Sequence, residues 1–188
     1  NFSPSLFKKN LVLTAALGII LAGIYLTSFF IFKNYLDIST ITTKLQEAID
    51  INLNNLIFIG LYIIIINSLL EEFFWRGFLF KKLRELIPPW LAYTISAIGF
   101  SLHHVVFYYN WFSIGFFLLV TIGLIIYALI MNWIFQRYKD LFSCWLIHIL
   151  GDISQIYIAF QIFKWNTSTS PKLSKKPCRY IRATLYRN

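Results

Sequence analysis

Seven ionisable side chains lie within or beside long apolar stretches of this sequence: Glu71, Glu72, Arg76, His103, His104, His148 and Asp152. A charged group at the centre of a bilayer costs about 2.5–3.5 kcal/mol on insertion scales, so such residues indicate a function. Carboxylates and imidazoles are also the residue types that activate water and hold catalytic metal ions. This set therefore predicts acid–base or hydrolytic chemistry inside a membrane.

Two of the carboxylates are expected to behave differently. Glu72 and Arg76 are four residues apart, share a helix face, and are predicted to form a buried ion pair. Glu71, turned by about 100° around the helix, then keeps no countercharge and is the candidate general base. A purely structural role is the alternative for the Glu72–Arg76 pair.

A proline turn is expected to bring Glu71 and His104 together. Glu71 lies 17 residues before Pro88, and His104 lies 15 residues after Pro89. At about 1.5 Å per residue, both would lie about 22–26 Å from the turn, facing each other across a hairpin. His148 follows the next basic turn by about nine residues, which places it only about 13 Å deep. It is therefore expected to be shallower than the other two.

Neighbours on the same helix faces are predicted to orient the working imidazoles. Phe100 shares a face with His104, and Asp152 shares a face with His148, because each pair is four residues apart. His103 is expected to form a hydrogen bond between helices or to face another side.

The composition indicates an integral membrane protein. Of 188 residues, 58% are hydrophobic and only 13% are charged, whereas soluble domains carry roughly a quarter charged residues. The net charge of +9 comes from basic residues at the ends of apolar runs and in the C-terminal tail. That placement fits anionic lipid headgroups and argues against nucleic-acid binding. Two cysteines give no disulfide framework. The sequence begins with Asn1 rather than Met, as a fragment of a longer chain would.

The expected fold class is all-α, a polytopic transmembrane helix bundle of about five to six spans within residues 1–163. A span needs about 20 apolar residues. The expected spans are residues 11–32, one from about 53 into the 80s, two within 86–136 and a last one at 141–163. Residues 38–55 are expected to form an interfacial amphipathic segment. Residues 164–188 are expected to be a basic, disordered tail.

The charge distribution also predicts an orientation. The positive-inside rule places the basic residues of 8–9, 81–84 and 137–139 together in the cytoplasm. Five spans would then place the basic tail on the opposite side, which the same rule disfavours.

Three short motifs carry a family resemblance. Residues 71–76 fit EExxxR, residues 100–104 fit FxxxH and residues 148–152 fit HxxxN/D. In this order on successive membrane helices, they resemble the CPBP family of intramembrane endopeptidases. This family comprises CAAX-processing and bacteriocin-processing proteases and was formerly known as the abortive-infection (Abi) family. The resemblance covers about residues 56–158, the expected protease-like core.

The resemblance implies a role for each matched residue. Glu71 would activate the attacking water, and His104 would help to hold it. His148 and Asp152 would stabilise the oxyanion. Many relatives have Asn at the position of Asp152, and an Asp there needs a proton or a donor partner for this role. The resemblance leaves open a catalytic zinc on Glu71, His104 and His148 or a metal-free, glutamate-activated water.

The expected substrate is a membrane-associated peptide or small protein. The abundance of Ile, Lys, Asn and Phe suggests a bacterial cell membrane, where peptide pheromones or bacteriocins are plausible substrates. The main alternative is a non-catalytic bacteriocin self-immunity or interaction protein on the same fold. A transporter or proton relay is less compatible, because no repeat is present. A cysteine protease using Cys144, His148 and Asp152 would have poor nucleophile geometry on one helix. The sequence does not indicate an oligomeric state.

Overall fold

The computed structural model describes residues 4–169, and these residues form helices and no strands. The long helices are α1 (Pro4–Phe32), α6 (Pro89–Tyr108), α7 (Ile114–Tyr138) and α8 (Leu141–Thr169). The shorter ones are α2 (Ile38–Ile49), α3 (Leu56–Leu61), α4 (Ser68–Glu72) and α5 (Lys81–Leu86). A 3₁₀ turn at Lys33–Tyr35 follows α1. The all-α prediction is confirmed.

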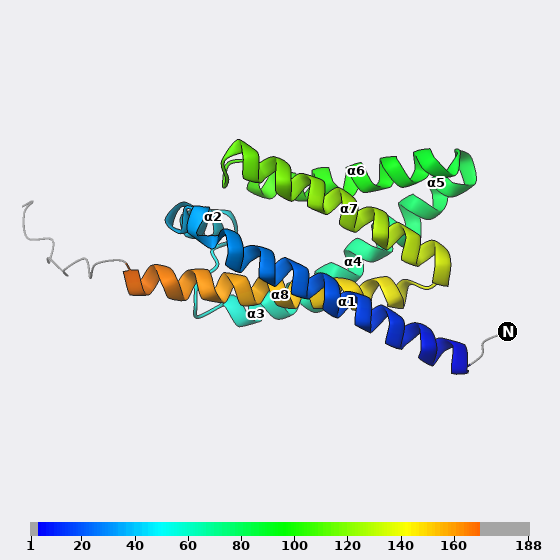
Figure 1. Cartoon of the computed structure of the whole chain (residues 1–188), viewed down its shortest axis with the longest axis horizontal. Helices are drawn as coiled ribbons and strands as arrows, with labels where there is room; N and C mark the ends of the chain where they lie inside the picture. Colours follow the sequence, from blue (N-terminus) through cyan, green and yellow to red (C-terminus); the bar gives the residue numbers. More distant parts are fainter. Residues whose placement is uncertain (1–3, 170–188) are drawn as a thin grey trace, which may run out of the picture.

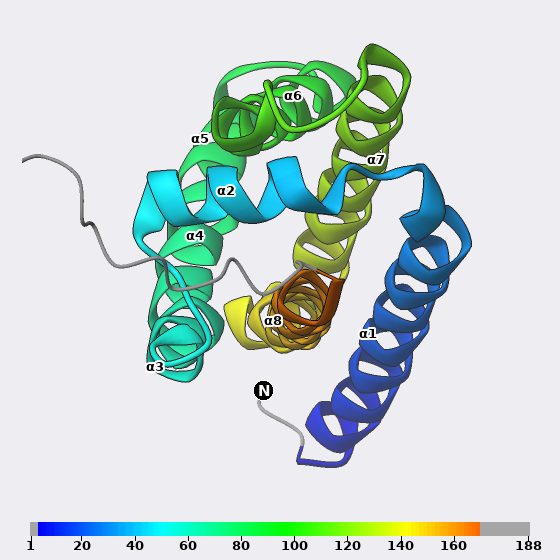
Figure 2. The ribbon, with the colours of Figure 1, turned by 90° about the vertical axis from the view of Figure 1, so that its left-hand side faces the viewer.

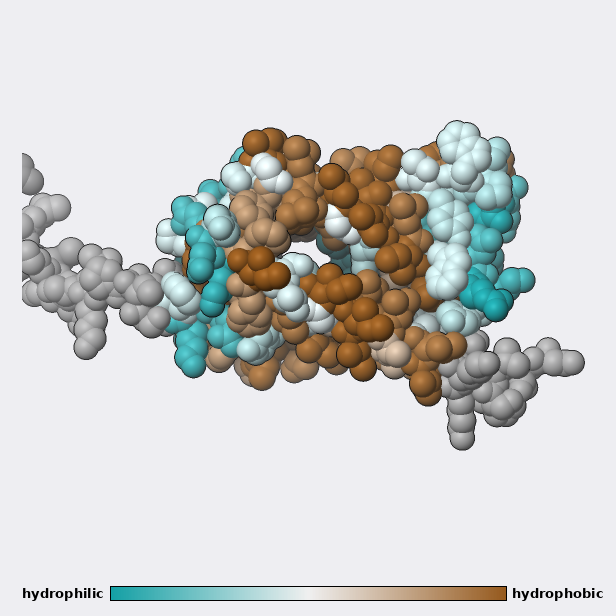
Figure 3. All heavy atoms as spheres, in the orientation of Figure 1, coloured by the Kyte–Doolittle hydropathy of each residue, from teal (hydrophilic) through white to brown (hydrophobic). Residues whose placement is uncertain are grey.

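Five of the helical segments are long and apolar enough to cross a membrane. They are Leu11–Tyr35, Leu56–Leu86, Pro89–Tyr108, Ile114–Tyr138 and Leu141–Trp165. Figure 3 shows the corresponding hydrophobic belt between two more hydrophilic ends. The chain is therefore a multi-pass integral membrane protein, and its residues 4–169 contain five candidate spans, the lower of the two predicted counts.

The bundle has two layers joined by the second span. Helices α1 and α8 pack along each other in one layer, and α6 pairs with α7 in the other (Figure 1). The second span begins with α3 beside α8, passes through α4 and ends with α5 beside α6 (Figures 1 and 2). One continuous segment thus contacts both layers, which places its middle between them.

Proline causes the sharp turn after this span, as predicted. Helix α5 ends at Leu86, Ile87 is extended, and α6 starts at Pro89 with Pro88 as its N-cap. Proline has no N–H to donate and disfavours a helical conformation in the residue before it, so α5 cannot continue. The first helical position of α6 accepts a proline without loss.

The last helix is longer than expected. Helix α8 continues past Phe163 to Thr169, into the segment expected to form the tail, and the division of the chain into bundle and tail at residue 164 stays a prediction. The first residues of that polar segment include no proline or glycine, and the helix continues through them. The rest of the predicted tail, residues 170–188, lies outside the described residues.

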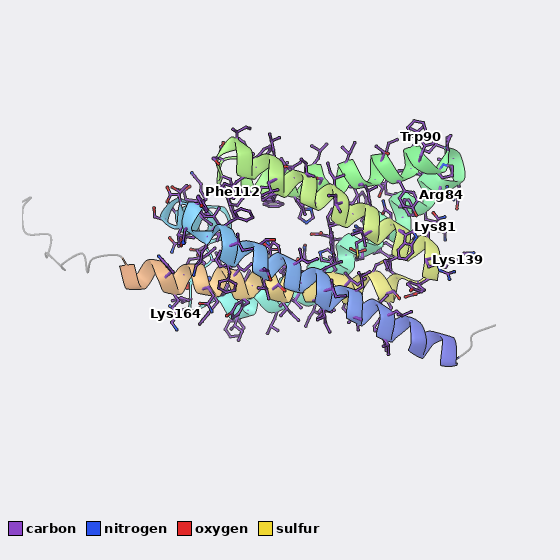
Figure 4. All side chains as sticks on the ribbon, viewed as in Figure 1. Lys81, Arg84, Trp90, Phe112, Lys139 and Lys164 are labelled. Carbon is purple, nitrogen blue, oxygen red and sulfur yellow. The ribbon has the colours of Figure 1, made fainter. Side chains whose placement is uncertain are left out.

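Basic residues lie at both ends of the bundle, as an odd number of spans predicts for this sequence. Lys81, Arg84 and Lys139 gather at one end of the bundle, and Lys164 lies at the other end (Figure 4). The first group lies at the end of the bundle that the positive-inside rule assigns to the cytoplasm. Lys164 then lies on the opposite side.

Helix α2 covers the end of α8, where an interfacial segment was predicted. Its Ile41 is 4% exposed and packs in one apolar cluster with Ile158 and Ile162 of α8. The helix begins with Asp37 as its N-cap, whose side chain accepts hydrogen bonds from Thr40 N at 3.1 Å and Thr40 Oγ1 at 2.8 Å. Such caps satisfy the amide groups that a helix start leaves unpaired.

The Asp37 cap predicts a pH dependence of α2. The Thr40 amide hydrogen bond holds the pKa of Asp37 below its ordinary value of 3.8. A carboxyl group whose pKa is lowered on folding stabilises the folded state above the ordinary value, and this contribution is lost as the pH falls through the lowered pKa. We expect amide exchange in α2, corrected for intrinsic rates, to accelerate only at such acidic pH. In Asp37→Ala, it should already be fast at neutral pH. Equal protection in both proteins at neutral pH would contradict this role of Asp37.

Candidate active site

The span that carries the two glutamates has an irregular backbone. Two π-helical segments, Tyr62–Asn67 and Phe73–Phe80, flank the short helix α4 that contains Glu71 and Glu72. No residue in the sequence marks the first of these segments, because Tyr62–Asn67 contains neither proline nor glycine. π-Helical turns are rare and occur frequently at functional sites.

Three residues from three spans meet at Glu71. Glu71 Oε2 lies 3.5 Å from His104 Nε2 of α6 and 3.9 Å from His148 Nε2 of α8. The side chains of Glu71 and His148 are 13% and 8% exposed. The expected depth difference for His148 is therefore absent. Because the second span crosses from the α8 layer to the α6 layer, Glu71 reaches both histidines.

Each histidine is oriented through its other ring nitrogen. His104 Nδ1 donates to the carbonyl oxygen of Phe100 at 2.9 Å, and the two rings lie 4.3 Å apart. His148 Nδ1 lies 2.7 Å from Glu72 Oε1. Since a carbonyl and an ionised carboxylate only accept hydrogen bonds, Nδ1 carries the hydrogen in both rings. Both therefore present Nε2 to Glu71.

Glu72 and Arg76 form the buried ion pair that their spacing predicts. Arg76 Nη1 lies 2.8 Å from Glu72 Oε1, and both side chains are completely buried. The guanidinium also lies over the Phe100 ring at 4.4 Å. The contact of Glu72 with His148 was not predicted, because sequence spacing gives no information about pairs on different helices. Glu72 thus connects the ion pair to the imidazole.

Asp152 lies beside His148 with one oxygen still available. Its Oδ1 is 3.7 Å from His148 Nε2. Its Oδ2, like Glu71 Oε2, is buried and has no hydrogen-bond partner among the described residues. Buried polar atoms are normally hydrogen-bonded to protein, water or ligand. These two oxygens are therefore open to a bound water or substrate group, and the role of Asp152 at the oxyanion stays a prediction.

Two further residues contact Glu71. Asn67 Nδ2 donates to Glu71 Oε1 at 2.6 Å, and the signal in the sequence was its position four residues before Glu71. His103 Nε2 lies 3.9 Å from the same oxygen, and its ring rests against Trp75 at 5.9 Å. His103 was expected either to form a hydrogen bond between helices or to face another side. It faces Glu71 across the two helices, at a distance longer than a hydrogen bond.

The cysteine alternative receives no support from the geometry. Cys144 is buried in an apolar cluster with Met131, Ile134 and Ile147. Its Sγ lies 3.6 Å from the carbonyl oxygen of Met131 in α7. The thiol therefore faces α7.

The predicted zinc ligands Glu71, His104 and His148 have side chains of suitable chemistry. Two imidazole nitrogens and a carboxylate are a common catalytic zinc set. Across residues 4–169, however, no three His, Cys, Asp or Glu side chains are arranged to hold a metal ion. We therefore derive no reaction step through zinc, and the zinc site stays a prediction.

Comparison with known proteins identifies the family. The family model described as type II CAAX prenyl endopeptidase Rce1-like matches residues 53–154, more than half of the chain. The chain belongs to this family. No curated protein and no solved structure matches it. The Rce1-like region contains all seven residues of the three motifs, whereas α1 and α2 lie outside it. Membership in the Rce1-like family supports protease activity in the membrane at the level of the family.

Proposed function

We propose that this chain is an intramembrane endopeptidase in which Glu71 activates a water molecule for attack on a peptide carbonyl. The observation that carries this proposal is the position of Glu71 Oε2, which lies within 3.9 Å of Nε2 of both His104 and His148 and has no hydrogen-bond partner within residues 4–169. A general base must lie within reach of the proton it removes, and this oxygen is buried, oriented and available.

The first step is the activation of water. A water molecule bound between Glu71 Oε2 and His104 Nε2 gives one proton to Glu71 while its oxygen attacks the carbonyl carbon. His104 Nε2 accepts the second hydrogen bond of this water and orients it, because His104 Nδ1 is bound to the Phe100 carbonyl. The new C–O bond places negative charge on the former carbonyl oxygen.

The second step is the stabilisation of this oxyanion and the loss of the amine. An imidazolium at His148 donates from Nδ1 to Glu72 and from Nε2 to the oxyanion. Carboxylate oxygens of Glu71, Glu72 and Asp152 lie within 3.9 Å of the ring nitrogens of His148. The C–N bond then breaks, and Glu71 returns its proton to the leaving nitrogen.

The proposed substrate is a membrane-associated peptide or small protein. All three central residues lie within candidate spans, so the scissile bond must enter the bilayer. The family description suggests a peptide with a prenylated C-terminal CAAX sequence. For a bacterial chain, a peptide pheromone or bacteriocin is the corresponding proposal.

Purified protein in lipid vesicles tests this function directly. Two peptides of identical CAAX sequence, with and without a prenyl group on the cysteine, would be incubated with the vesicles and analysed by mass spectrometry. We expect a new internal cleavage of the prenylated peptide. The self-immunity alternative makes two different predictions. Neither the two peptides nor a set of bacteriocins is cleaved, and a variant of this protein in which Glu71, His104 and His148 are all replaced by Ala still protects cells from a bacteriocin.

The same assay tests the metal. The protein would be treated with a zinc chelator, dialysed and assayed before and after addition of zinc. If Glu71 activates water without a metal, activity persists after chelation. Loss of activity that zinc alone restores would instead support the ligand set Glu71, His104 and His148.

The two adjacent histidines give a matched pair of variants. His104→Gln should lower kcat about a hundredfold, the size expected for loss of a group that acts in proton transfer. His103→Gln should have a much smaller effect, because His103 is 46% exposed and faces the other oxygen of Glu71. Steady-state kinetics of both variants in vesicles measure the difference. Equal losses in the two variants would contradict the assignment of His104.

A further inference from the structure

The two oxygens of the Glu71 carboxylate have different surroundings. Oε1 accepts a hydrogen bond of 2.6 Å from Asn67 Nδ2. Oε2 has no hydrogen-bond partner among the described residues and lies 3.5 Å from His104 Nε2 and 3.9 Å from His148 Nε2. One oxygen is therefore held, and the other faces the two imidazoles.

The helical turn that presents both residues is fixed against the rest of the bundle. Asn67 is the last residue of a π-helical segment, and Ser68 starts α4. Ser68 is completely buried, and its hydroxyl accepts a hydrogen bond of 3.0 Å from Trp145 Nε1 of α8. Residues four apart in a helix share a face, so the Asn67 amide reaches Glu71 from a fixed position.

An asparagine suits this position for a chemical reason. An ionised carboxylate only accepts hydrogen bonds, so the amide group must present its NH₂ to Glu71. A lysine or arginine here would neutralise the carboxylate and weaken it as a base. The neutral amide restrains Glu71 and leaves its charge in place.

We propose that Asn67 is a positioning residue of the active site, which holds Glu71 Oε1 and thereby directs Oε2 at His104 and His148. This inference rests on the proposed function of Glu71 as the general base. The terminal torsion of a glutamate has a broad, roughly two-fold profile, so a carboxylate without a donor turns easily. Without Asn67, Oε1 also becomes open to His103, which lies 3.9 Å away.

Three substitutions at this position separate positioning from packing. Asn67→Asp keeps the shape but removes the donor, Asn67→Ala removes the side chain, and Asn67→Gln keeps a donor on a longer side chain. We expect kcat to fall about 10- to 100-fold in the Asp and Ala variants, with KM nearly unchanged, because a displacement of about 1 Å can cost a hundredfold in rate. Asn67→Gln should recover part of the loss.

The matched control is Asn132, a buried asparagine on α7. Its Oδ1 accepts from Ser96 Oγ at 3.4 Å and links α7 to α6. Asn132→Ala should lower thermal stability, while kcat per folded molecule stays at the wild-type value. If Asn67 had a purely structural role, Asn67→Ala would likewise lower thermal stability and leave kcat unchanged. Measuring kcat and thermal stability in both variants therefore distinguishes positioning from packing.

A second measurement uses Glu71→Asp, whose side chain is one methylene shorter, so that its carboxylate no longer reaches the Asn67 amide. In this background, Asn67→Ala should have little further effect on kcat, because the contact is already broken. Wild-type kcat in both Asn67→Asp and Asn67→Ala, alongside an inactive Glu71→Gln, would overturn this inference and leave the proposed function intact. An active Glu71→Gln would overturn the proposed function itself.

Discussion

Glu71→Gln is expected to lower the rate of peptide cleavage about 10²- to 10⁴-fold, the range found for loss of a general acid–base group. The amide has nearly the shape of the carboxylate, and its oxygen can still accept the hydrogen bond from Asn67. It cannot take a proton from water, so the chemical step fails while the fold remains. The measurement is kcat of the purified variant on a cleaved peptide, with thermal unfolding as the check of the fold.

Glu47→Gln provides the matched control for this substitution. Glu47 lies on α2, is 59% exposed and pairs with Lys44 at 2.9 Å. The same chemical change there should leave both kcat and thermal stability near the wild-type values, since exposed ion pairs contribute little. Comparable losses of activity in the two variants would show that Glu71 has no special role.

Arg76→Met is expected to have the largest effect on stability, about 3–5 kcal/mol, as is typical when one partner of a buried ion pair is removed. The substitution leaves Glu72 completely buried with a charge and without its 2.8 Å partner. His148 still contacts Glu72 at 2.7 Å and compensates only in part. Chemical unfolding of the detergent-solubilised protein measures the loss.

The double variant Glu72→Gln/Arg76→Met should recover much of this stability, because it removes the uncompensated charge together with its partner. Lys82→Met is the control, since Lys82 pairs with Glu85 at the surface, where both side chains are at least half exposed. It should change stability little. If the double variant is as unstable as Arg76→Met alone, the lost packing of Arg76 on Phe100 dominates over the charge effect.

The spans, the proximity of Glu71 to His104 and the Glu72–Arg76 pair could be predicted from the sequence, for identifiable reasons. Apolar run lengths alone give the five spans, and Pro88–Pro89 fixes the turn that brings Glu71 opposite His104. The Glu72–Arg76 pair follows from spacing within one helix. These features depend on local sequence or on a single turn, which a pattern of residues can specify.

What could not be predicted depends on packing between helices. Measuring depth from each turn made His148 too shallow, because it took the helices as parallel, whereas the second span crosses between two layers (Figure 1). The π-helical segment that precedes α4, Tyr62–Asn67, contains no proline or glycine that would indicate an irregular backbone. The contact of His148 with Glu72 joins residues 76 positions apart, beyond any helical spacing rule.

We propose that Glu71, His104 and His148 together hydrolyse peptide bonds in the membrane. The most direct test is the number of prenylated peptide molecules that each protein molecule cleaves in vesicles containing only this chain, counted by mass spectrometry for wild type and Glu71→Gln. We expect many cleavage events per wild-type molecule and about 10²- to 10⁴-fold fewer in the same time for the variant. Equal cleavage by the two proteins at the same peptide bond would contradict this proposal.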